Sequence, residues 1–190
     1  MKVNKIFSIP VFSKSLSHNN DEISSYCKAQ KEKNIQGNTI SNVGGWQSNS
    51  FYSIPEELND LFTSVQQFSE EVCHFMGISS VKFANAWINI NDYKDFNWTH
   101  SHIDSILSGV YYVKTPENCG NLIFENPCIE SMEVSLKPER INVFNEFNCI
   151  GWAQKPESGL LCLFPGWVKH KVMPNMNESE NRISISFNLT

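Results

Sequence analysis

The sequence predicts an α+β chain that is helical first and mainly β afterwards, with a sandwich or barrel as its second part. Two observations lead to this fold class. Apolar residues recur at three- and four-residue steps only before Gly77, and short strand-like runs broken by Gly, Pro, Asn and Glu follow it. A length of 190 residues fits one domain with a full core and is short for two. We therefore expect a single domain over residues 1–190, with a helical layer at 1–80 and a β core at 81–190.

Two helices are expected in the first part. The polar stretch His18–Asn34 opens with capping residues and is modestly amphipathic. The stretch Ile54–Ile78 is clearer, since Pro55 lies in its first turn and Gly77 stops it. Its apolar stripe consists of Leu58, Leu61, Phe62, Val65, Phe68, Val72 and Phe75. This stripe predicts a helix packed on the outer face of the sheet.

Eight strand-like runs are expected in the second part. They are KFANAWINI (82–90), SGVYYVK (108–114), NLIFENP (121–127), MEVSLK (132–137), NVFNEFNCI (142–150), GLLCLFP (159–165), VKHKV (168–172) and RISISFNL (182–189). In the last run, polar and apolar residues alternate, which places them on opposite faces of a strand. In a simple one-sided sheet the polar face would meet water. In a barrel covered by helices it would point inward, and an inward Arg182 would need an anion, with Ser184 as a second donor.

The composition narrows the class of protein and its partners. Hydrophobic residues make up 41%, charged residues 18%, and the net charge is −5 without a long Lys/Arg run. We therefore expect a globular protein without a nucleic-acid partner. No run approaches the roughly 18 apolar residues of a membrane span, and the N-terminus does not resemble a secretory signal. Six cysteines lack CxxC spacing, which favours reduced structural thiols and a cytoplasmic location.

Histidines and a carboxylate gather in the stretch "NWTHSHIDSILSGVYYV", which begins at Asn97. His100, His102 and Asp104 could be metal ligands, an acid–base pair, or polar residues at the mouth of a strand. His170 lies far downstream at another strand-like run. Two histidines and one carboxylate on one face of a metal leave open positions, as in non-haem Fe(II) oxygenases. An HxD pattern alone is weak evidence, but a distal histidine followed by Arg182 on a strand makes it more specific.

Four stretches together resemble the Fe(II)/2-oxoglutarate-dependent oxygenases, and specifically an oxygenase group with a core like that of prolyl hydroxylases. They are "GGWQS" from Gly44, "HSHIDSILSGVYYV" from His100, "FPGWVKHKVMPN" from Phe164 and "RISISFNL" from Arg182. The resemblance implies a double-stranded β-helix, a jelly-roll or cupin-like barrel, with the N-terminal helices on its outer sheet face. It also implies Fe(II), 2-oxoglutarate and O₂ as cofactor and cosubstrates.

The resemblance assigns roles to individual residues. His102, Asp104 and His170 would bind Fe(II) and form the catalytic centre. Arg182, supported by Ser184, would pair with the distal carboxylate of 2-oxoglutarate. Tyr112 matches the second tyrosine of the prolyl-hydroxylase "YYL" strand and would bond the same carboxylate, while Tyr111 would pack on the opposite face.

Two further points concern the surroundings of this site. His100 shares a face with His102 and could replace a ligand, although we expect it to lie beside the metal site or to face the substrate. Trp46 and Trp98 are the expected substrate walls, and the other tryptophans are expected to pack.

The function implied is a dioxygenase, most simply a hydroxylase of a small molecule, amino acid or peptide side chain, releasing succinate and CO₂. The alternative is a non-catalytic cupin-like barrel that binds a metal or metabolite. Neither the substrate nor the oligomeric state follows from the sequence.

Overall fold

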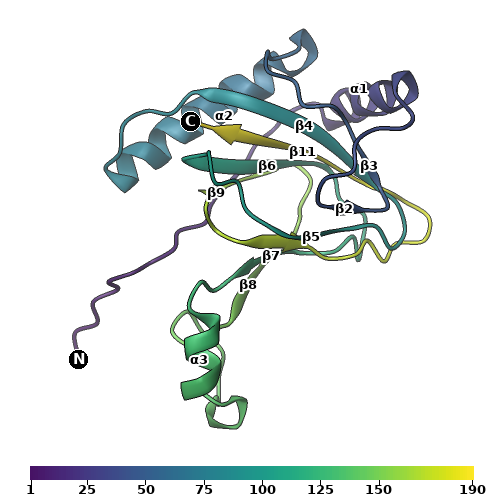
Figure 1. The fold of residues 1–190 in the computed structure, drawn as a ribbon. Helices are drawn as coiled ribbons and strands as arrows, with labels where there is room; N and C mark the ends of the chain where they lie inside the picture. The colour runs from purple at the N-terminus through teal and green to yellow at the C-terminus, as the bar shows by residue number, and fades with distance from the viewer.

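Two antiparallel sheets face each other in the computed structural model, which describes all residues 1–190 (Figure 1). The first sheet has the strand order β1-β9-β6-β11-β4-β3 and the second has the order β2-β5-β10-β7-β8. The strands are β1 (Phe12–Ser15), β2 (Asn42–Val43), β3 (Trp46–Gln47), β4 (Phe83–Asn91), β5 (Phe96–His100), β6 (Leu107–Lys114), β7 (Leu122–Glu125), β8 (Gly151–Gln154), β9 (Leu160–Pro165), β10 (His170–Val172) and β11 (Arg182–Leu189). The arrangement confirms the predicted mainly-β α+β fold and is consistent with a double-stranded β-helix.

Helices α1 (Asn20–Lys33) and α2 (Asn59–Met76) cover the outer face of the six-stranded sheet (Figure 1). A 3₁₀ turn, η1 (Glu56–Leu58), leads into α2. Gly77 ends α2 with φ 67°, a left-handed conformation that favours glycine. Its amide bonds the carbonyl of His74, and the amide of Ile78 bonds that of Cys73. The predicted stripe is buried except for Phe75, which is 77% exposed.

The two faces of the six-stranded sheet belong to two separate cores. Residues Ile183 and Ile185 of β11 pack with α2 in the larger core, outside the barrel. Residues Val110 and Phe164 belong to the smaller core between the sheets. Burial of each large aliphatic side chain contributes roughly 1.5–3 kcal/mol to the stability of the fold. Contact between the helices and the sheet therefore depends on these apolar side chains of the outer face. The polar face of β11 is thereby left to point into the barrel.

Two predicted strands are wrong. The segment MEVSLK lies mostly in helix α3 (Ile129–Ser135), and a 3₁₀ turn, η2 (Pro138–Arg140), follows it. Neither element buries a residue, and α3 projects away from the barrel between β7 and β8 (Figure 1). The segment NVFNEFNCI forms turns, in which Asn145 accepts a hydrogen bond from the Phe147 amide and Asn148 accepts one from the Asn145 amide. Such local side-chain bonds compete with strand pairing.

Five strands were not predicted. Strands β1, β2 and β3 belong to residues 1–80, so this part is not purely helical. Strands β5 and β8 also lie outside the predicted runs. No helix has the length and apolar character needed to cross a bilayer.

Candidate active site

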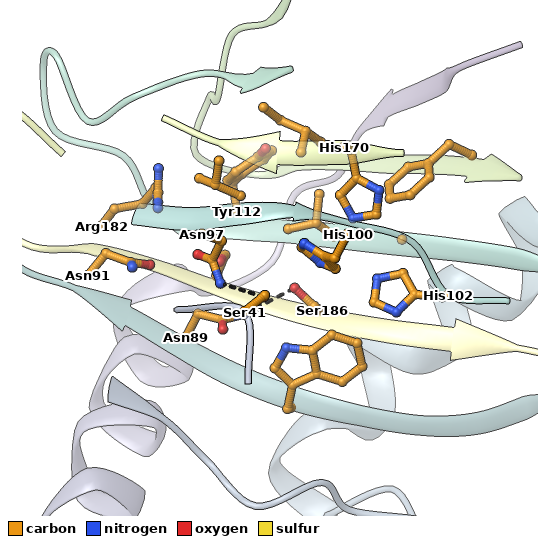
Figure 2. A pocket seen from close by; sticks show the side chains of 17 residues that line it. Ser41, Asn89, Asn91, Asn97, His100, His102, Tyr112, His170, Arg182 and Ser186 are labelled. Atoms are coloured by element: carbon orange, nitrogen blue, oxygen red, sulfur yellow. Dashed lines mark hydrogen bonds between the residues drawn. The ribbon is translucent and has the colours of Figure 1, made fainter. Parts of the chain in front are cut away.

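Three histidine side chains meet between the two sheets (Figure 2). One ligand atom from each of His100, His102 and His170 lies within 4.8 Å of the other two. The rings of His100 and His170 are 4.4 Å apart between centroids, and those of His102 and His170 are 5.2 Å apart. Three nitrogen donors at this separation can hold one divalent metal ion.

Strand pairing brings the distant histidine to the other two. His100 ends β5 and His170 begins β10, and the two residues are direct partners in the antiparallel register. His102 follows two residues after β5, where its amide bonds the Gly166 carbonyl at 2.8 Å. The segment that precedes β10 therefore fixes the position of His102 as well as that of His170.

Hydrogen bonds orient two of the three rings. Nδ1 of His100 lies 2.7 Å from the Trp98 carbonyl, and Nδ1 of His170 lies 2.9 Å from the Val168 carbonyl. Because a carbonyl only accepts, each Nδ1 carries the hydrogen and each Nε2 lone pair is free for a metal. The rings of His100 and His170 are thus oriented by hydrogen bonds to backbone carbonyls.

Burial keeps the three imidazoles neutral. Desolvation lowers the pKa of His100, lowers that of His102 to about 4 and lowers that of His170 to about 3. The neighbouring histidines lower the last two further. Neutral imidazole is the form that binds metals, so the site is prepared for a cation at neutral pH.

Asp104 does not join this cluster. Its side chain is exposed on the turn after His102, and it is not among the residues whose ligand atoms converge. The structure brings together two of the three predicted ligands, His102 and His170, and adds His100. The set of His102, Asp104 and His170 therefore stays a prediction, and the geometry favours a different third ligand.

The predicted anion-binding residues line the same cavity as the histidines (Figure 2). Arg182 is 2% exposed, and Ser184 and Tyr112 are 6% and 4% exposed. Nη1 of Arg182 donates to the carbonyls of Cys119 at 2.7 Å and Gly120 at 3.3 Å. No carboxylate lies within ion-pairing distance of this guanidinium, and its burial lowers its pKa.

A cation so deeply buried calls for an anion. Both hydrogen bonds of the Arg182 side chain use Nη1, so its Nε–H and Nη2 groups remain for a ligand.

The comparison with protein families decides the class. Residues 85–188, just over half of the chain, match the family described as "Putative 2OG-Fe(II) oxygenase". The chain belongs to this family. The family is a class of non-haem iron dioxygenases, and membership implies Fe(II) and 2-oxoglutarate.

Solved oxygenase structures have the same fold. A prolyl-4-hydroxylase from Pseudomonas putida has a TM-score of 0.64 at 14% identity, over 96% of this chain and 92% of that one. A viral collagen prolyl hydroxylase from Paramecium Bursaria Chlorella virus-1 has a TM-score of 0.58 at 13% identity, over 94% of each chain.

A third structure is a prolyl hydroxylase from Trichoplax adhaerens in complex with a hypoxia inducible factor peptide. It has a TM-score of 0.64 at 12% identity, over 94% of this chain and 82% of that one. No curated protein sequence is significantly similar to the chain. At these identities the structural similarities show the fold alone.

Further residues of this oxygenase line the cavity without having been singled out in the sequence. Asn89 and Asn91 of β4 and Asn97 of β5 face it with their amides, and Trp87 lies 5.6 Å from His102 between ring centroids. The alternation of Asn85, Trp87, Asn89 and Asn91 with apolar residues was the available signal, since it matches the alternation in β11. The two expected substrate walls do not line the cavity, because Trp46 is buried in the outer core and Trp98 is 64% exposed.

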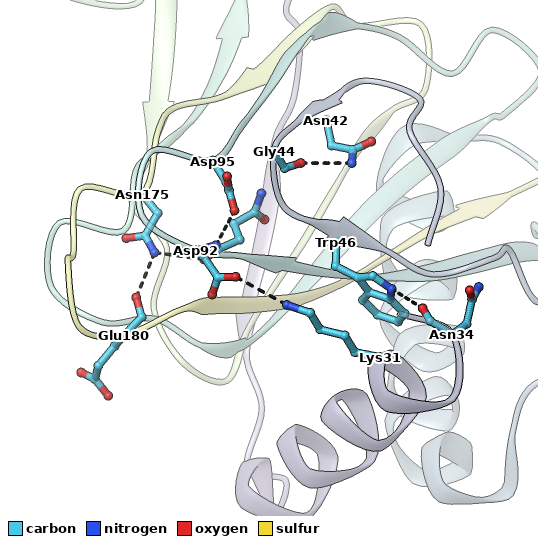
Figure 3. A network of polar contacts seen from close by, with 10 residues as sticks. Lys31, Asn34, Asn42, Gly44, Trp46, Asp92, Asp95, Asn175 and Glu180 are labelled. Atoms are coloured by element: carbon cyan, nitrogen blue, oxygen red, sulfur yellow. Dashed lines mark hydrogen bonds and ion pairs between the residues drawn. The ribbon is translucent and has the colours of Figure 1, made fainter. Parts of the chain in front are cut away.

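Polar contacts surround the glycine-rich loop of the oxygenase (Figure 3). The Trp46 indole donates to the Asn34 carbonyl at 2.7 Å, and the Asp92 amide donates to the Asp95 carboxylate at 2.7 Å. At Gly44, φ is 63°, and a Cβ there would collide with Asp95.

A residue that precedes this loop in the chain lines the cavity. Ser41 lines the cavity and accepts a hydrogen bond from Asn97 at 3.1 Å. The stretch "GGWQS" itself, residues 44–48, does not line the cavity and follows this wall in the chain.

Proposed function

We propose that this oxygenase hydroxylates an unactivated C–H bond of a small molecule, amino acid or peptide side chain, and that His100, His102 and His170 hold its iron. In this reaction 2-oxoglutarate, O₂ and the substrate R–H give succinate, CO₂ and R–OH. The observation that carries the proposal is the convergence of three neutral imidazoles on one side of a cavity that has an unpaired, buried Arg182 on the other.

The donor set fits a divalent transition metal. Imidazole nitrogens suit iron as well as zinc and copper, and three donors leave positions open for a cosubstrate. Fe(II) bound there would supply the redox chemistry that couples the oxidation of 2-oxoglutarate to hydroxylation. Replacing a carboxylate by a third imidazole makes the site more positive by one charge, so we expect it to hold the acidic end of 2-oxoglutarate firmly.

Arg182 is proposed to bind the distal carboxylate of 2-oxoglutarate. The guanidinium is fixed by two carbonyls, which leaves two donor groups for a two-pronged contact. Ser184 and Tyr112 are direct partners across β11 and β6, and both hydroxyls lie in the cavity. Burial raises the pKa of Tyr112, so its hydroxyl keeps its proton and donates.

The apolar residues of the cavity exclude water from the reaction. Phe164 packs on His170 at 4.8 Å between ring centroids, and Val110 and Leu122 lie beside it in the inner core. A dry surrounding strengthens the contact of the charged ligand with Arg182.

The proteins that share the fold bear on the substrate class. The prolyl hydroxylases that share the fold include one solved with a peptide, which makes a peptide side chain a reasonable substrate. The six cysteines are free, as expected for a reducing compartment, and the cytoplasmic location stays a prediction. The single-domain organisation also stays a prediction.

One observation favours the alternative of a non-catalytic metal-binding barrel. A set of three histidines is one that zinc also takes. The two functions separate by experiment, because only the oxygenase consumes 2-oxoglutarate.

The test is anaerobic loading of the full chain with Fe(II) and 2-oxoglutarate, followed by exposure to O₂ and measurement of succinate. We expect an absorption band in the visible range before oxygen is added and slow succinate release afterwards, even without substrate. Tight metal binding without 2-oxoglutarate binding or succinate release would contradict the proposal and support the alternative.

A further inference from the structure

Three polar side chains form a row on the inner face of the six-stranded sheet, one step along the strands from Trp87, whose ring lies 5.6 Å from that of His102. The row consists of Ser108 on β6, Asn188 on β11 and Asn85 on β4, which are direct partners in the register. The Ser108 hydroxyl donates to Oδ1 of Asn188 at 2.8 Å, and Nδ2 of Asn188 donates to Oδ1 of Asn85 at 3.0 Å. All hydrogen bonds in the row therefore run in one direction.

Because of this direction, N–H donors remain free at the Asn85 end of the row. Nδ2 of Asn85 makes no hydrogen bond within the protein, and Nδ2 of Asn188 uses one of its two hydrogens. An amide carries two N–H donors on its nitrogen, so three hydrogens remain. A site with spare donors binds a hydrogen-bond acceptor.

Burial shows that Asn188 and Asn85 lie near solvent, whereas Ser108 is 1% exposed. On β11, Arg182 and Ser184 are buried, whereas Ser186 and Asn188 are partly exposed. On β4, Asn89 and Asn91 are buried, whereas Asn85 and Trp87 are partly exposed. Asn188 and Asn85 therefore lie partly exposed beside Ser186 and Trp87, which line the cavity.

The acceptor that fits is uncharged. The row has no formal charge, and Arg182 is the only lysine or arginine that lines the cavity. A carboxylate at a half-buried site of neutral amides would lose hydration without gaining a cation. A carbonyl oxygen needs only the N–H groups, and the flat face of Trp87 beside the row suits a planar amide.

We propose that the Ser108–Asn188–Asn85 row binds a carbonyl oxygen of an uncharged, amide-containing substrate of peptide type, with Asn85 as the principal donor. The inference rests on the proposed function, since it places this substrate over the histidine site. It narrows the substrate class from any small molecule or peptide to one that presents a neutral amide.

The test uses the full chain loaded with Zn(II) and 2-oxoglutarate, which does not turn over. Calorimetry first measures the binding of 2-oxoglutarate. A pool of N-acetylated, C-amidated pentapeptides of uncharged residues is then titrated, with the Trp87 indole N–H resonance as readout. The same pool with free termini is the comparison. We expect a saturable shift with the blocked pool and a half-saturating concentration at least tenfold higher with the free-terminus pool.

The deciding variant is Asn85→Asp. The aspartate can still accept from Asn188, so the row stays intact, but it has no N–H to offer. We expect the half-saturating concentration of the blocked pool to rise at least tenfold while 2-oxoglutarate affinity stays unchanged. Asn121→Asp is the matched control, because Asn121 is exposed next to Gly120, at the Arg182 end. It should change peptide binding less than twofold.

The outcomes separate the two proposals. Absence of metal or 2-oxoglutarate binding contradicts the proposed function. If 2-oxoglutarate binds normally, three results would overturn this inference alone. These are no shift with the blocked pool, tighter binding of the free-terminus pool, or unchanged binding of the blocked pool by Asn85→Asp.

Discussion

At the scale of single residues, the proposed ligand set contains His100 in place of the expected Asp104. His100 and Asp104 flank His102 at equal distances in the sequence, and both would share its side if the whole segment were extended. The chain leaves the extended conformation after His100, so alternation no longer holds at Asp104. The register of β5 with β10 places His100 directly opposite His170. A pairing between strands 70 residues apart thus decides which neighbour of His102 faces the metal site.

Removal of each candidate ligand tests this assignment. His100→Ala should lose most of the bound iron, because two nitrogen donors hold a metal far more weakly than three. Asp104→Ala should retain iron and succinate release within about twofold, since its side chain is exposed. For both variants, the metal content is measured after dialysis, and activity is measured as succinate release. Retained iron in His100→Ala together with iron loss in Asp104→Ala would restore the ligand set expected from the HxD pattern.

Arg182 should control the affinity for 2-oxoglutarate and leave the metal in place. Hydrogen bonds to charged groups contribute roughly 1.5–3 kcal/mol each, and ~1.4 kcal/mol is a factor of ten. Arg182→Ala should therefore weaken 2-oxoglutarate binding at least tenfold. Arg182→Lys should recover only part, because an ammonium cannot make the two-pronged contact. Anaerobic calorimetry gives the affinity; an unchanged value in Arg182→Ala would remove Arg182 from the cosubstrate site.

At the scale of elements, helix α2 decides which way the sheet faces. It covers one face of the six-stranded sheet with buried residues such as Leu61, Phe62 and Val65. The apolar residues of β4 and β11 lie on that face, so their polar residues must point into the barrel. The helix thereby creates the polar lining of the active site without touching it.

The packing of α2 can be measured by truncation. Phe62 is 3% exposed and contacts the rings of Phe83 and Phe187. Phe62→Ala should lower the free energy of unfolding by about 3–5 kcal/mol, because it leaves a cavity in the outer core. Phe75→Ala removes the same atoms from an exposed position and should cost less than about 1 kcal/mol. Denaturant unfolding compares them; equal losses would mean that α2 is not packed as described.

At the scale of the whole molecule, the three histidines link stability to pH. Their pKa values in the folded state lie below the ordinary value of about 6.5, to about 4 for His102 and about 3 for His170. Between the lowered pKa values of the folded state and the ordinary value, the unfolded chain binds more protons than the folded one, so stability rises with pH. The contribution of these neutral histidines to stability is complete above about pH 6.5 and declines as the pH falls toward 4.

Thermal unfolding of the metal-free protein between pH 7.5 and 5 should show this decline. A double variant, His102→Gln with His170→Gln, should show a clearly smaller one, because two of the groups that must stay neutral are gone. His74→Gln, on the exposed side of α2, serves as the control and should follow the unaltered chain. If the double variant lost stability as steeply as the unaltered chain, the histidines would not be the cause.

The sequence by itself determined the fold class, the long helix, most core strands and the alternation of β11, because these depend on local periodicity. It also pointed to His102, His170, Arg182, Ser184 and Tyr112, which the structure brings to one cavity. Only the tertiary structure decided that β11 turns its polar face inward, that His100 joins the histidines, and that Trp87 and the asparagines of β4 line the site. The physical reason is that period-two alternation separates two faces without saying which is covered. That choice depends on helix packing and on the register of strands far apart in the chain.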